Sequence, residues 1–289
     1  MKTVRLYEKI ARLRQQMRVL AQVSKQLTKQ PDRQLSMTAP DARSMATSGR
    51  GSGIVGDNDQ VAVDTKHHLI VEHEVTNAGN DHGQLSKMAL SRKSAVGKQK
   101  LKVVADRGYF SGPEIRACDL NDISAYVPKP LTSASTKKRL FTKADFVYEA
   151  KGDIFRCPAG ERAIHRFNTV EHDITRRVYW PSTCPRCPIN ERCSPSDYRS
   201  IRRWEHENPL EAMQRRLDRK SDAMTIRRST VEHVFGTLKH WTGPAHFLTK
   251  TLGLASTEMS LQVLAYNLKR VMNILVVAGT MKAMKMAAS

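Results

Sequence analysis

The segment that most constrains the fold is the run KLKVVADRGYFSGPEI, which begins at Lys100. Its apolar residues between 101 and 105 predict a buried strand that ends at Asp106. A helix is expected near 113–120 and a second strand in DISAYVPKP, so the three elements form a short β-α-β unit. The strands of such a unit are normally parallel. Asp106 is therefore expected at the carboxyl edge of a sheet, where open α/β sheets place their ligands.

The chain is strongly basic. Its 289 residues carry a formal net charge of +20, and its pI is near 10.0. Lys and Arg neutralise phosphates and release counterions, so a charge of this size favours a polyanionic partner. Because these residues occur along the whole chain, we expect that partner to be nucleic acid. The sequence shows neither a run of about 18 apolar residues nor the apolar core of a secretory signal, so we expect no membrane span and a cytoplasmic location.

The first part of the chain predicts a long helix over residues 3–30. Its apolar residues follow a heptad-like spacing: Leu6, Ile10, Leu13, Met17, Leu20 and Leu27. This pattern is typical of a coiled-coil arm or one half of a helical hairpin, and packing against the rest of the chain is the alternative. Residues 31–58 are polar and rich in Ser, Gly, Asp and Pro, which predicts a loop.

Two antiparallel strands are expected after this loop. The run QVAVDTKHHLIVEHEVTNA alternates apolar and polar residues on either side of Asp64–His67, which predicts a hairpin. A helix is expected over 81–96. Just before the hairpin, the segment GDNDQ at 56–60 carries Asp59, and a carboxylate at that position lowers the tendency of the segment to be buried.

A second candidate acid lies in IRRSTVEHVFGTLKHW. We expect a helix there, with a buried stripe formed by Val231, Phe235 and Leu238. An adjacent stripe consists of Arg228, Glu232, Gly236 and Lys239. It could be an ordinary surface face with an Arg–Glu pair worth a few tenths of a kcal/mol. A glycine in mid-helix costs about 1 kcal/mol relative to alanine. Gly236 therefore suggests a close approach by a ligand or another backbone.

Residues 135–205 have a different character. They hold Cys157, Cys184, Cys187 and Cys193, many Arg and Pro residues, and no clear helical period, and we interpret them as an insertion. Four thiolates could bind a structural Zn²⁺ ion tetrahedrally. The alternative is a cluster of reduced cysteines in a small apolar subdomain. Cys118, on the helix near 113–120, is interpreted as an ordinary core residue.

The sequence resembles the DDE-type transposases of bacterial insertion sequences, in the subgroup with a Cys-rich insertion. The resemblance rests on the segments APDARSM, AVDTKHHLIVEHEVTN, VVADRGYF and RRSTVEHVFGTLK. The last segment carries the spacing of Arg228, Glu232 and Lys239 that is typical of the family's third acidic residue. It departs from the pattern at Thr225, where many relatives carry a tyrosine.

The resemblance implies an RNase H-like α/β fold: a mixed sheet flanked by helices, with Asp, Asp and Glu holding two Mg²⁺ ions. Asp106 corresponds to the second acid and Glu232 to the third, and Arg228 and Lys239 correspond to DNA contacts. The first acid lies in an Asp-Gly-(Thr/Ser)-Lys block that this sequence does not show. Asp64 and Asp41 are interpreted as turn and loop residues. We therefore expect an incomplete first strand and a chain truncated at its N-terminus.

These observations predict four regions: a helical arm at 1–38, a first part of the core at 39–134, the Cys-rich insertion at 135–205, and core helices at 206–289. The expected function is Mg²⁺-dependent DNA cleavage and strand transfer at insertion-sequence ends, by a homo-oligomer on nucleoid DNA. One alternative is an inactive, truncated descendant that binds DNA or an intact transposase. Another is a zinc-bearing structural or DNA-binding protein in which the acidic residues are incidental. Enzyme activity is left open, because the first acid is missing.

Overall fold

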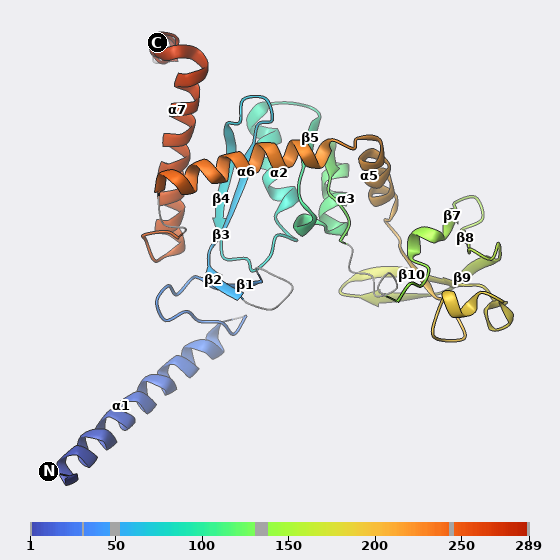
Figure 1. Cartoon of the computed structure of the whole chain (residues 1–289), viewed down its shortest axis with the longest axis horizontal. Helices are drawn as coiled ribbons and strands as arrows, with labels where there is room; N and C mark the ends of the chain where they lie inside the picture. Colours follow the sequence, from blue (N-terminus) through green and yellow to red (C-terminus); the bar gives the residue numbers. More distant parts are fainter. Residues whose placement is uncertain (1, 31, 47–52, 131–137, 243–245, 288–289) are drawn as a thin grey trace.

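The structure, a computed structural model, describes residues 2–30, 32–46, 53–130, 138–242 and 246–287. Figure 1 shows a central body of helices and strands, a long N-terminal helix that projects from it, and a separate group of strands on the opposite side. The mixed α/β class expected from the sequence is confirmed. None of the described helices combines the length and the apolar character that crossing a membrane requires.

The projecting helix is α1 (Lys2–Lys29), and its described side chains are largely exposed. Helix α1 therefore does not pack against the described remainder of the chain. This outcome contradicts the alternative in which the heptad residues pack against the body. A small antiparallel ribbon follows, formed by β1 (Arg43–Ala46) and β2 (Gly53–Gly56).

The expected hairpin is confirmed. Strands β3 (Asn58–Val63) and β4 (Ile70–Thr76) pair antiparallel. At the turn, the Asp64 carboxylate accepts a hydrogen bond of 2.8 Å from the backbone N–H of His67. Asp64 is thus a turn residue, as the sequence indicated.

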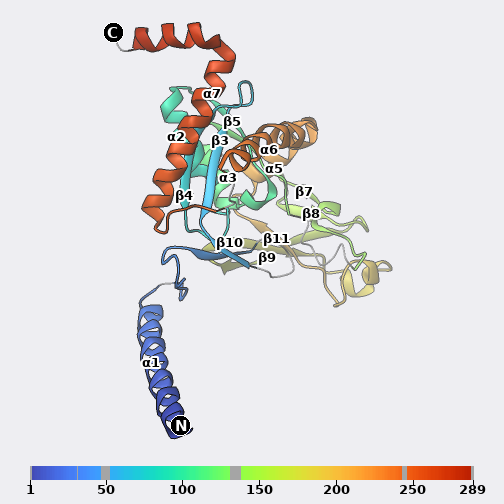
Figure 2. The same cartoon turned by 60° about the vertical axis from the view of Figure 1, so that its left-hand side comes forward.

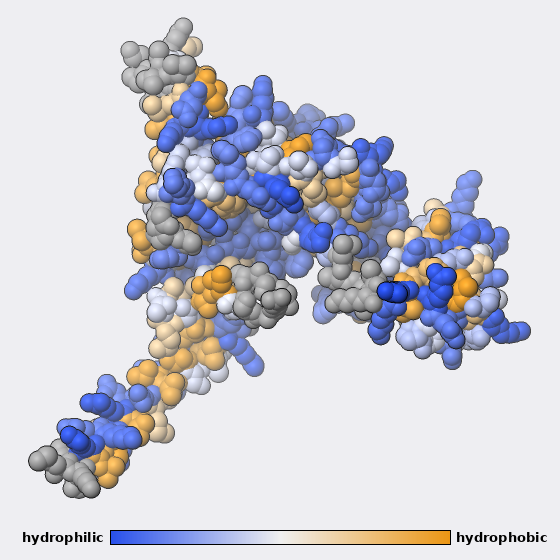
Figure 3. All heavy atoms as spheres, in the orientation of Figure 1, coloured by the Kyte–Doolittle hydropathy of each residue, from blue (hydrophilic) through white to orange (hydrophobic). Residues whose placement is uncertain are grey.

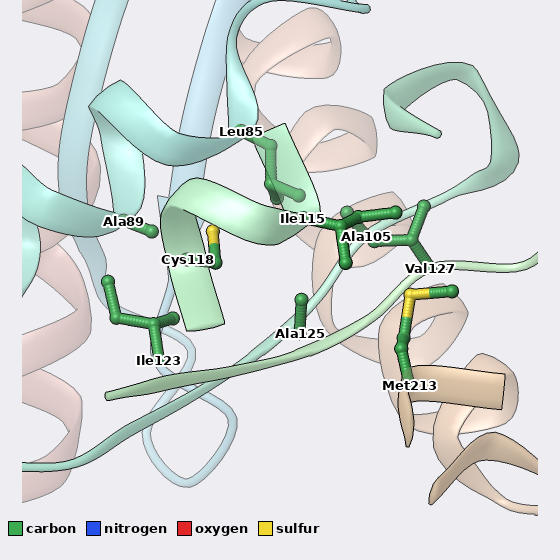
Figure 4. Close-up of a cluster of buried hydrophobic side chains, with 9 residues drawn as sticks. All are labelled: Leu85, Ala89, Ala105, Ile115, Cys118, Ile123, Ala125, Val127 and Met213. Atoms are coloured by element: carbon green, nitrogen blue, oxygen red, sulfur yellow. The ribbon is translucent and has the colours of Figure 1, made fainter. Parts of the chain in front are cut away.

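The β-α-β unit is also confirmed. Strands β5 (Leu101–Val104) and β6 (Ile123–Tyr126) pair in parallel. They are joined through the short 3₁₀ turn η1 (Arg107–Tyr109) and helix α3 (Gly112–Leu120). A cluster of buried side chains packs these elements against α2 (Leu85–Val96) and α5 (Asn208–Arg219). Figure 4 shows its members: Leu85, Ala89, Ala105, Ile115, Cys118, Ile123, Ala125, Val127 and Met213.

The strands of the body differ from the expected single mixed sheet. Among the described strands, β3 pairs with β4 alone and β5 pairs with β6 alone, so the body holds two separate two-stranded sheets. Both α2 and α6 (Ala223–Thr242) contact β3 and β5. Figure 2 shows these two helices on opposite sides of the strands. The helices therefore join the two sheets where strand pairing does not.

Residues 147–204 form a five-stranded antiparallel sheet that the sequence did not predict. Its order is β11-β10-β9-β8-β7. The strands are β7 (Val147–Glu149), β8 (Ile154–Arg156), β9 (Arg162–Glu171), β10 (Ile174–Trp180) and β11 (Ile201–Trp204). Short 3₁₀ turns flank them: η2 (Lys143–Asp145), η3 (Cys184–Arg186) and η4 (Asn190–Arg192). Phe146, Phe155 and Tyr179 are central members of its own small core.

The last two helices, α6 and α7 (Leu252–Ala287), pack against the β3–β4 hairpin. The expected buried stripe of α6 needs correction. Val234 is fully buried and Leu238 nearly so, whereas Val231 and Phe235 are only partly buried. At the start of α7, the Asp41 carboxylate accepts a hydrogen bond of 2.9 Å from the N–H of Leu252, so Asp41 caps a helix.

Candidate active site

Asp106 follows β5 directly and caps the turn η1. Its Oδ1 atom accepts a hydrogen bond of 2.8 Å from the backbone N–H of Gly108. Its Oδ2 atom accepts one of 2.8 Å from Nη2 of Arg227, a residue of α6. The Asp106 side chain is 42% exposed, so a ligand can reach it. The Asp106 carboxylate is thus held in place by a backbone N–H and a guanidinium, and it remains open to solvent. Such a carboxylate can bind a cation or a polar substrate.

Glu232 lies five residues beyond Arg227 on α6, about one and a half helical turns. Its Oε1 atom is 3.8 Å from Nη1 of Arg227 and 3.9 Å from Nε of Arg228. The Glu232 side chain is 61% exposed. Arg227 therefore contacts Asp106 with one nitrogen and approaches Glu232 with the other, so two acids far apart in the sequence meet at one guanidinium.

The sequence reasoning missed Arg227. The adjacent pair of arginines was visible, but nothing in the helical spacing showed which of them faces β5. Arg227 is the more buried of the two, with 25% of its side chain exposed against 78% for Arg228. That difference depends on how α6 packs, and packing is a tertiary property.

A further carboxylate, also missed from the sequence, lies next to Asp106. The Oδ1 atom of Asp81 accepts hydrogen bonds of 2.8 Å from Nδ2 of Asn58 and from Nε2 of Gln60. A Cβ atom built on Gly108 would lie 3.0 Å from Oδ1 of Asp106 and 3.3 Å from Oδ2 of Asp81. The two carboxylates therefore flank the same glycine, and any side chain at position 108 would crowd both.

Gln60 and Tyr109 extend this polar network into the interior. Gln60 is 2% exposed, and its Oε1 atom accepts a hydrogen bond from the Tyr109 hydroxyl. Burial raises the pKa of Tyr109, and the carboxylates of Asp81 and Asp106 raise it further. The phenol is thus a neutral donor that holds Gln60, which in turn orients Asp81.

A cavity of about 430 Å³ opens beside these residues. It runs between β3 and β5 and is bounded by α2 and α6. Asp81, Asp106, Tyr109 and Arg227 lie among its lining residues, together with the apolar side chains of both strands. The candidate site is therefore continuous with a partly enclosed cavity in the body of the molecule.

Asp59, on β3, is the acid whose environment is most unusual. Burial raises the pKa of Asp59 to about 6, the Asp57 carboxylate adds to the rise, and the Lys239 ammonium opposes it. Its Oδ1 atom is buried without a hydrogen-bond partner among the described residues. Asp59 therefore titrates in a range where ordinary aspartates are fully ionised.

The second expected stripe of α6 is a solvent-facing surface. Arg228, Glu232, Gly236 and Lys239 are all exposed. No described backbone approaches Gly236, because a Cβ atom there would meet no described atom within 4 Å, and the approach of a ligand stays a prediction. At the end of the helix, Trp241 packs against Tyr266.

The four cysteines of the insertion lie near one another. Cys184 and Cys193 are buried and Cys157 and Cys187 partly so, all as free thiols. Burial raises the pKa of Cys193, and the other three cysteines add to the rise while Arg199 opposes it. Even so, no group of three or more His, Cys, Asp or Glu side chains in the described parts of the chain is arranged to hold a metal ion. Cys118 belongs to the core, fully buried, as expected.

We compared the chain with known proteins. Residues 156–272 match the family model described as Transposase DDE domain. The match supports a DDE-type transposase. It includes Arg227 and Glu232, whereas Asp81 and Asp106 lie outside the matched range. No curated protein and no solved structure matches the chain.

Proposed function

We propose that this protein is a DNA transposase that cleaves and joins DNA strands at the ends of an insertion sequence. The observation that carries the proposal is the meeting of Asp106 and Glu232 at Arg227. Asp106 lies just beyond the end of β5, a partly buried strand, and Glu232 lies on α6, which contacts that strand. The family match and the net charge of +20 support a nucleic-acid substrate.

Asp106 and Glu232 are suitable ligands for Mg²⁺, which takes oxygen donors and is often held by one or two carboxylates plus substrate phosphates. In the proposed RNase H-like arrangement they would share two such ions. Bound Mg²⁺ would supply charge neutralisation at the attacked phosphate and a more acidic water or hydroxyl nucleophile. Arg227 holds the two carboxylates near one another, and its guanidinium would face a phosphate oxygen once released from Asp106.

The exposed stripe of α6 would contact the DNA backbone. Arg228 and Lys239 present their cationic side chains on the same solvent-facing side of the helix as Glu232. Contacts of this kind position a duplex without reading its sequence. We therefore assign these two residues to phosphate binding.

A nicking assay tests the proposal. Purified protein is incubated with supercoiled plasmid carrying the insertion-sequence ends, with Mg²⁺ or Mn²⁺, and DNA binding is measured in parallel by mobility shift. We expect metal-dependent nicking that Asp106→Asn and Glu232→Gln each abolish without weakening DNA binding. Asp218→Asn, at an exposed acid of α5, is the matched control and should nick normally. Nicking that survives both site substitutions would overturn the assignment.

One observation favours a second candidate function, a protein that binds DNA or an intact transposase without cleaving. Asp106 and Glu232 both approach Arg227. Among the described residues, however, no three His, Cys, Asp or Glu side chains are grouped so that they could hold a metal ion. This candidate predicts a normal mobility shift with no nicking under any metal condition. Loss of both activities would contradict the two candidates together.

We also propose that the protein acts as a homo-oligomer, paired through α1. The heptad residues of this helix are exposed although they are apolar: Leu6, Leu13, Met17 and Leu20 each expose half or more of their surface. Figure 3 shows apolar side chains along the projecting helix. A second copy of the same stripe is the natural partner for such a face.

A further inference from the structure

The cavity of the body is bordered by two strand edges. Its lining includes every residue of β3 and every residue of β5. Among the described strands, neither has a second pairing partner. A strand edge carries a row of N–H and C=O groups that readily pair with another chain. Two such edges border the same cavity, about 430 Å³ in volume.

The backbone of β5 shows which groups point into this cavity. The N–H groups of Leu101 and Ala105 donate to carbonyls next to β6, at 3.3 Å and 3.1 Å. Along a parallel strand, residues with their N–H groups on one side alternate with residues that point to the other side. The N–H groups of Lys102 and Val104 therefore point away from β6, toward β3.

The two strands run in opposite directions across the cavity. Gln60, near the start of β3, binds Asp81 and Tyr109, and Tyr109 lies just after the end of β5. The start of β3 therefore lies level with the end of β5. A strand between them would be parallel to one and antiparallel to the other, and both kinds of pairing are stable.

The two helices that cover the cavity indicate which side chains an occupying segment would carry. Helix α2 contacts both strands on one side and α6 contacts both on the other. The lining between them mixes polar residues, such as Asp59 and Lys102, with apolar ones. The apolar residues include Val61, Val63, Leu101 and Val103 on the strands and Met88 and Val231 on the helices. A strand covered on both faces is normally an unbroken apolar run.

We propose that this cavity is an acceptor for an extended, apolar strand of another polypeptide, which pairs with β3 and β5 at once and joins the two sheets into one. A helix would satisfy its own backbone and leave both edges unpaired, and it is about 10–12 Å across with side chains. An extended segment is narrow and offers main-chain donors and acceptors on both sides. One end of this strand lies beside Asp81 and Asp106.

Peptide binding tests the inference. The probe is a fluorescein-labelled peptide in which two lysines and a glycine precede Val-Thr-Ile-Val-Thr-Val, and binding is followed by fluorescence polarisation. The matched control peptide carries N-methyl groups on alternate backbone nitrogens, so its side chains are kept and its donors are lost. We expect the first peptide to bind and the methylated one to bind at least about tenfold more weakly, as the loss of two or more hydrogen bonds implies.

A protein variant locates the site. Lys102→Pro removes an N–H that points into the cavity and leaves those of Leu101 and Ala105 in place, whereas Lys102→Gln changes the charge alone. We expect the first variant to lose binding and the second to keep it. Amide hydrogen exchange on the wild-type protein tests the same site independently. The bound peptide should slow the exchange of the backbone N–H groups of Lys102 and Val104.

Equal binding of the methylated peptide, or protection confined to other segments, would overturn the inference. These measurements use neither DNA nor metal, so they succeed or fail independently of the nicking assay.

Discussion

At the residue scale, Arg227 determines how the candidate site is held together. Its guanidinium neutralises Asp106 directly and lies near Glu232, so the two acids can approach one another before any cation is present. The same contact has a cost for metal binding, because Arg227 occupies the Oδ2 atom of Asp106 that a metal ion would use. Arg227 and the proposed metal ion would therefore compete for one oxygen.

The first prediction follows from this competition. Arg227→Ala should tighten Mn²⁺ binding by about two- to fivefold, because a partly exposed ion pair is worth about 0.2–1 kcal/mol. Mn²⁺ titration followed by electron paramagnetic resonance measures this directly, without DNA. Arg228→Ala is the matched control and should leave the affinity unchanged, since Arg228 only approaches Glu232. Weaker Mn²⁺ binding by Arg227→Ala would show that the guanidinium assists the metal instead.

The second prediction concerns Asp59. Because its pKa is raised in the folded state, from 3.8 to about 6, ionisation of this carboxylate opposes folding. The penalty is complete above pH 6 and disappears as the pH falls below about 4. Asp59→Asn should therefore raise the free energy of unfolding at pH 8, by about 3 kcal/mol at most, and change it little at pH 4.

Urea denaturation of wild type and Asp59→Asn at the two pH values measures this difference. Asp218→Asn, at an exposed acid, serves as the reference and should show no such pH dependence. An equal effect of Asp59→Asn at pH 8 and pH 4 would mean that the Asp59 carboxylate is not destabilised by burial.

At the scale of elements, the sequence was informative where burial follows a simple period. The β3–β4 hairpin and the β5-α3-β6 unit were predictable because their apolar residues alternate or cluster. Strand β9 was not, since most of its residues are exposed and it carries polar side chains on both faces. Its pairing with β10 and β8 comes from tertiary context, which a local pattern does not contain.

The difference between local pattern and tertiary context also explains which residues of the candidate site could be predicted. Asp106 and Glu232 could be selected because Asp106 follows an apolar run that predicts a strand and Glu232 stands in a recognisable helix. Asp81 and Arg227 could not, because each acquires its role from side-chain contacts between elements: Asp81 from Asn58 and Gln60 on β3, and Arg227 from Asp106. The register of a helix against a sheet is set by packing and is not visible in its spacing.

The third prediction belongs to the insertion. The described cysteines are not arranged to hold a metal ion in this structure. We nevertheless expect one zinc ion per purified chain to draw Cys157, Cys184, Cys187 and Cys193 together, because four thiolates match the preference of this metal. Elemental analysis measures the content. Cys184→Ser should lose the zinc and melt at a lower temperature, while Cys118→Ala, in the other core, should keep it. Wild-type protein free of zinc after purification without chelator would contradict the prediction.

At the scale of the whole molecule, α1 and the body differ in how their apolar side chains are exposed. The body buries many of its apolar side chains in clusters, although α7 also exposes several, such as Leu261 and Leu264. Helix α1 exposes a whole stripe of apolar side chains to solvent (Figure 3). Leucine occupies positions 6, 13, 20 and 27, and Ile10 and Met17 lie between them. A heptad stripe with leucine at every second position is typical of a coiled coil between helices.

The fourth prediction is that the protein is a dimer in solution. Leu13→Lys should convert it to a monomer, because a charge in the middle of the stripe would be buried without a partner. Gln15→Lys, on the opposite face of α1, is the control and should leave the dimer intact. Sedimentation velocity distinguishes the two species. A wild-type monomer at micromolar concentration would contradict the prediction.

A projecting helix of 28 residues is about 42 Å long. Two chains paired in parallel along it would carry their bodies at the same end, as one particle with two DNA-binding surfaces. When one body of the dimer has bound the first transposon end, the second end is tethered to the same DNA molecule. The effective concentration of that second end near the free body would then be set by the length of the intervening DNA and not by the concentration of free protein. Synapsis of the two ends would then become an intramolecular event, and dilution of the protein would slow the first capture but not the second.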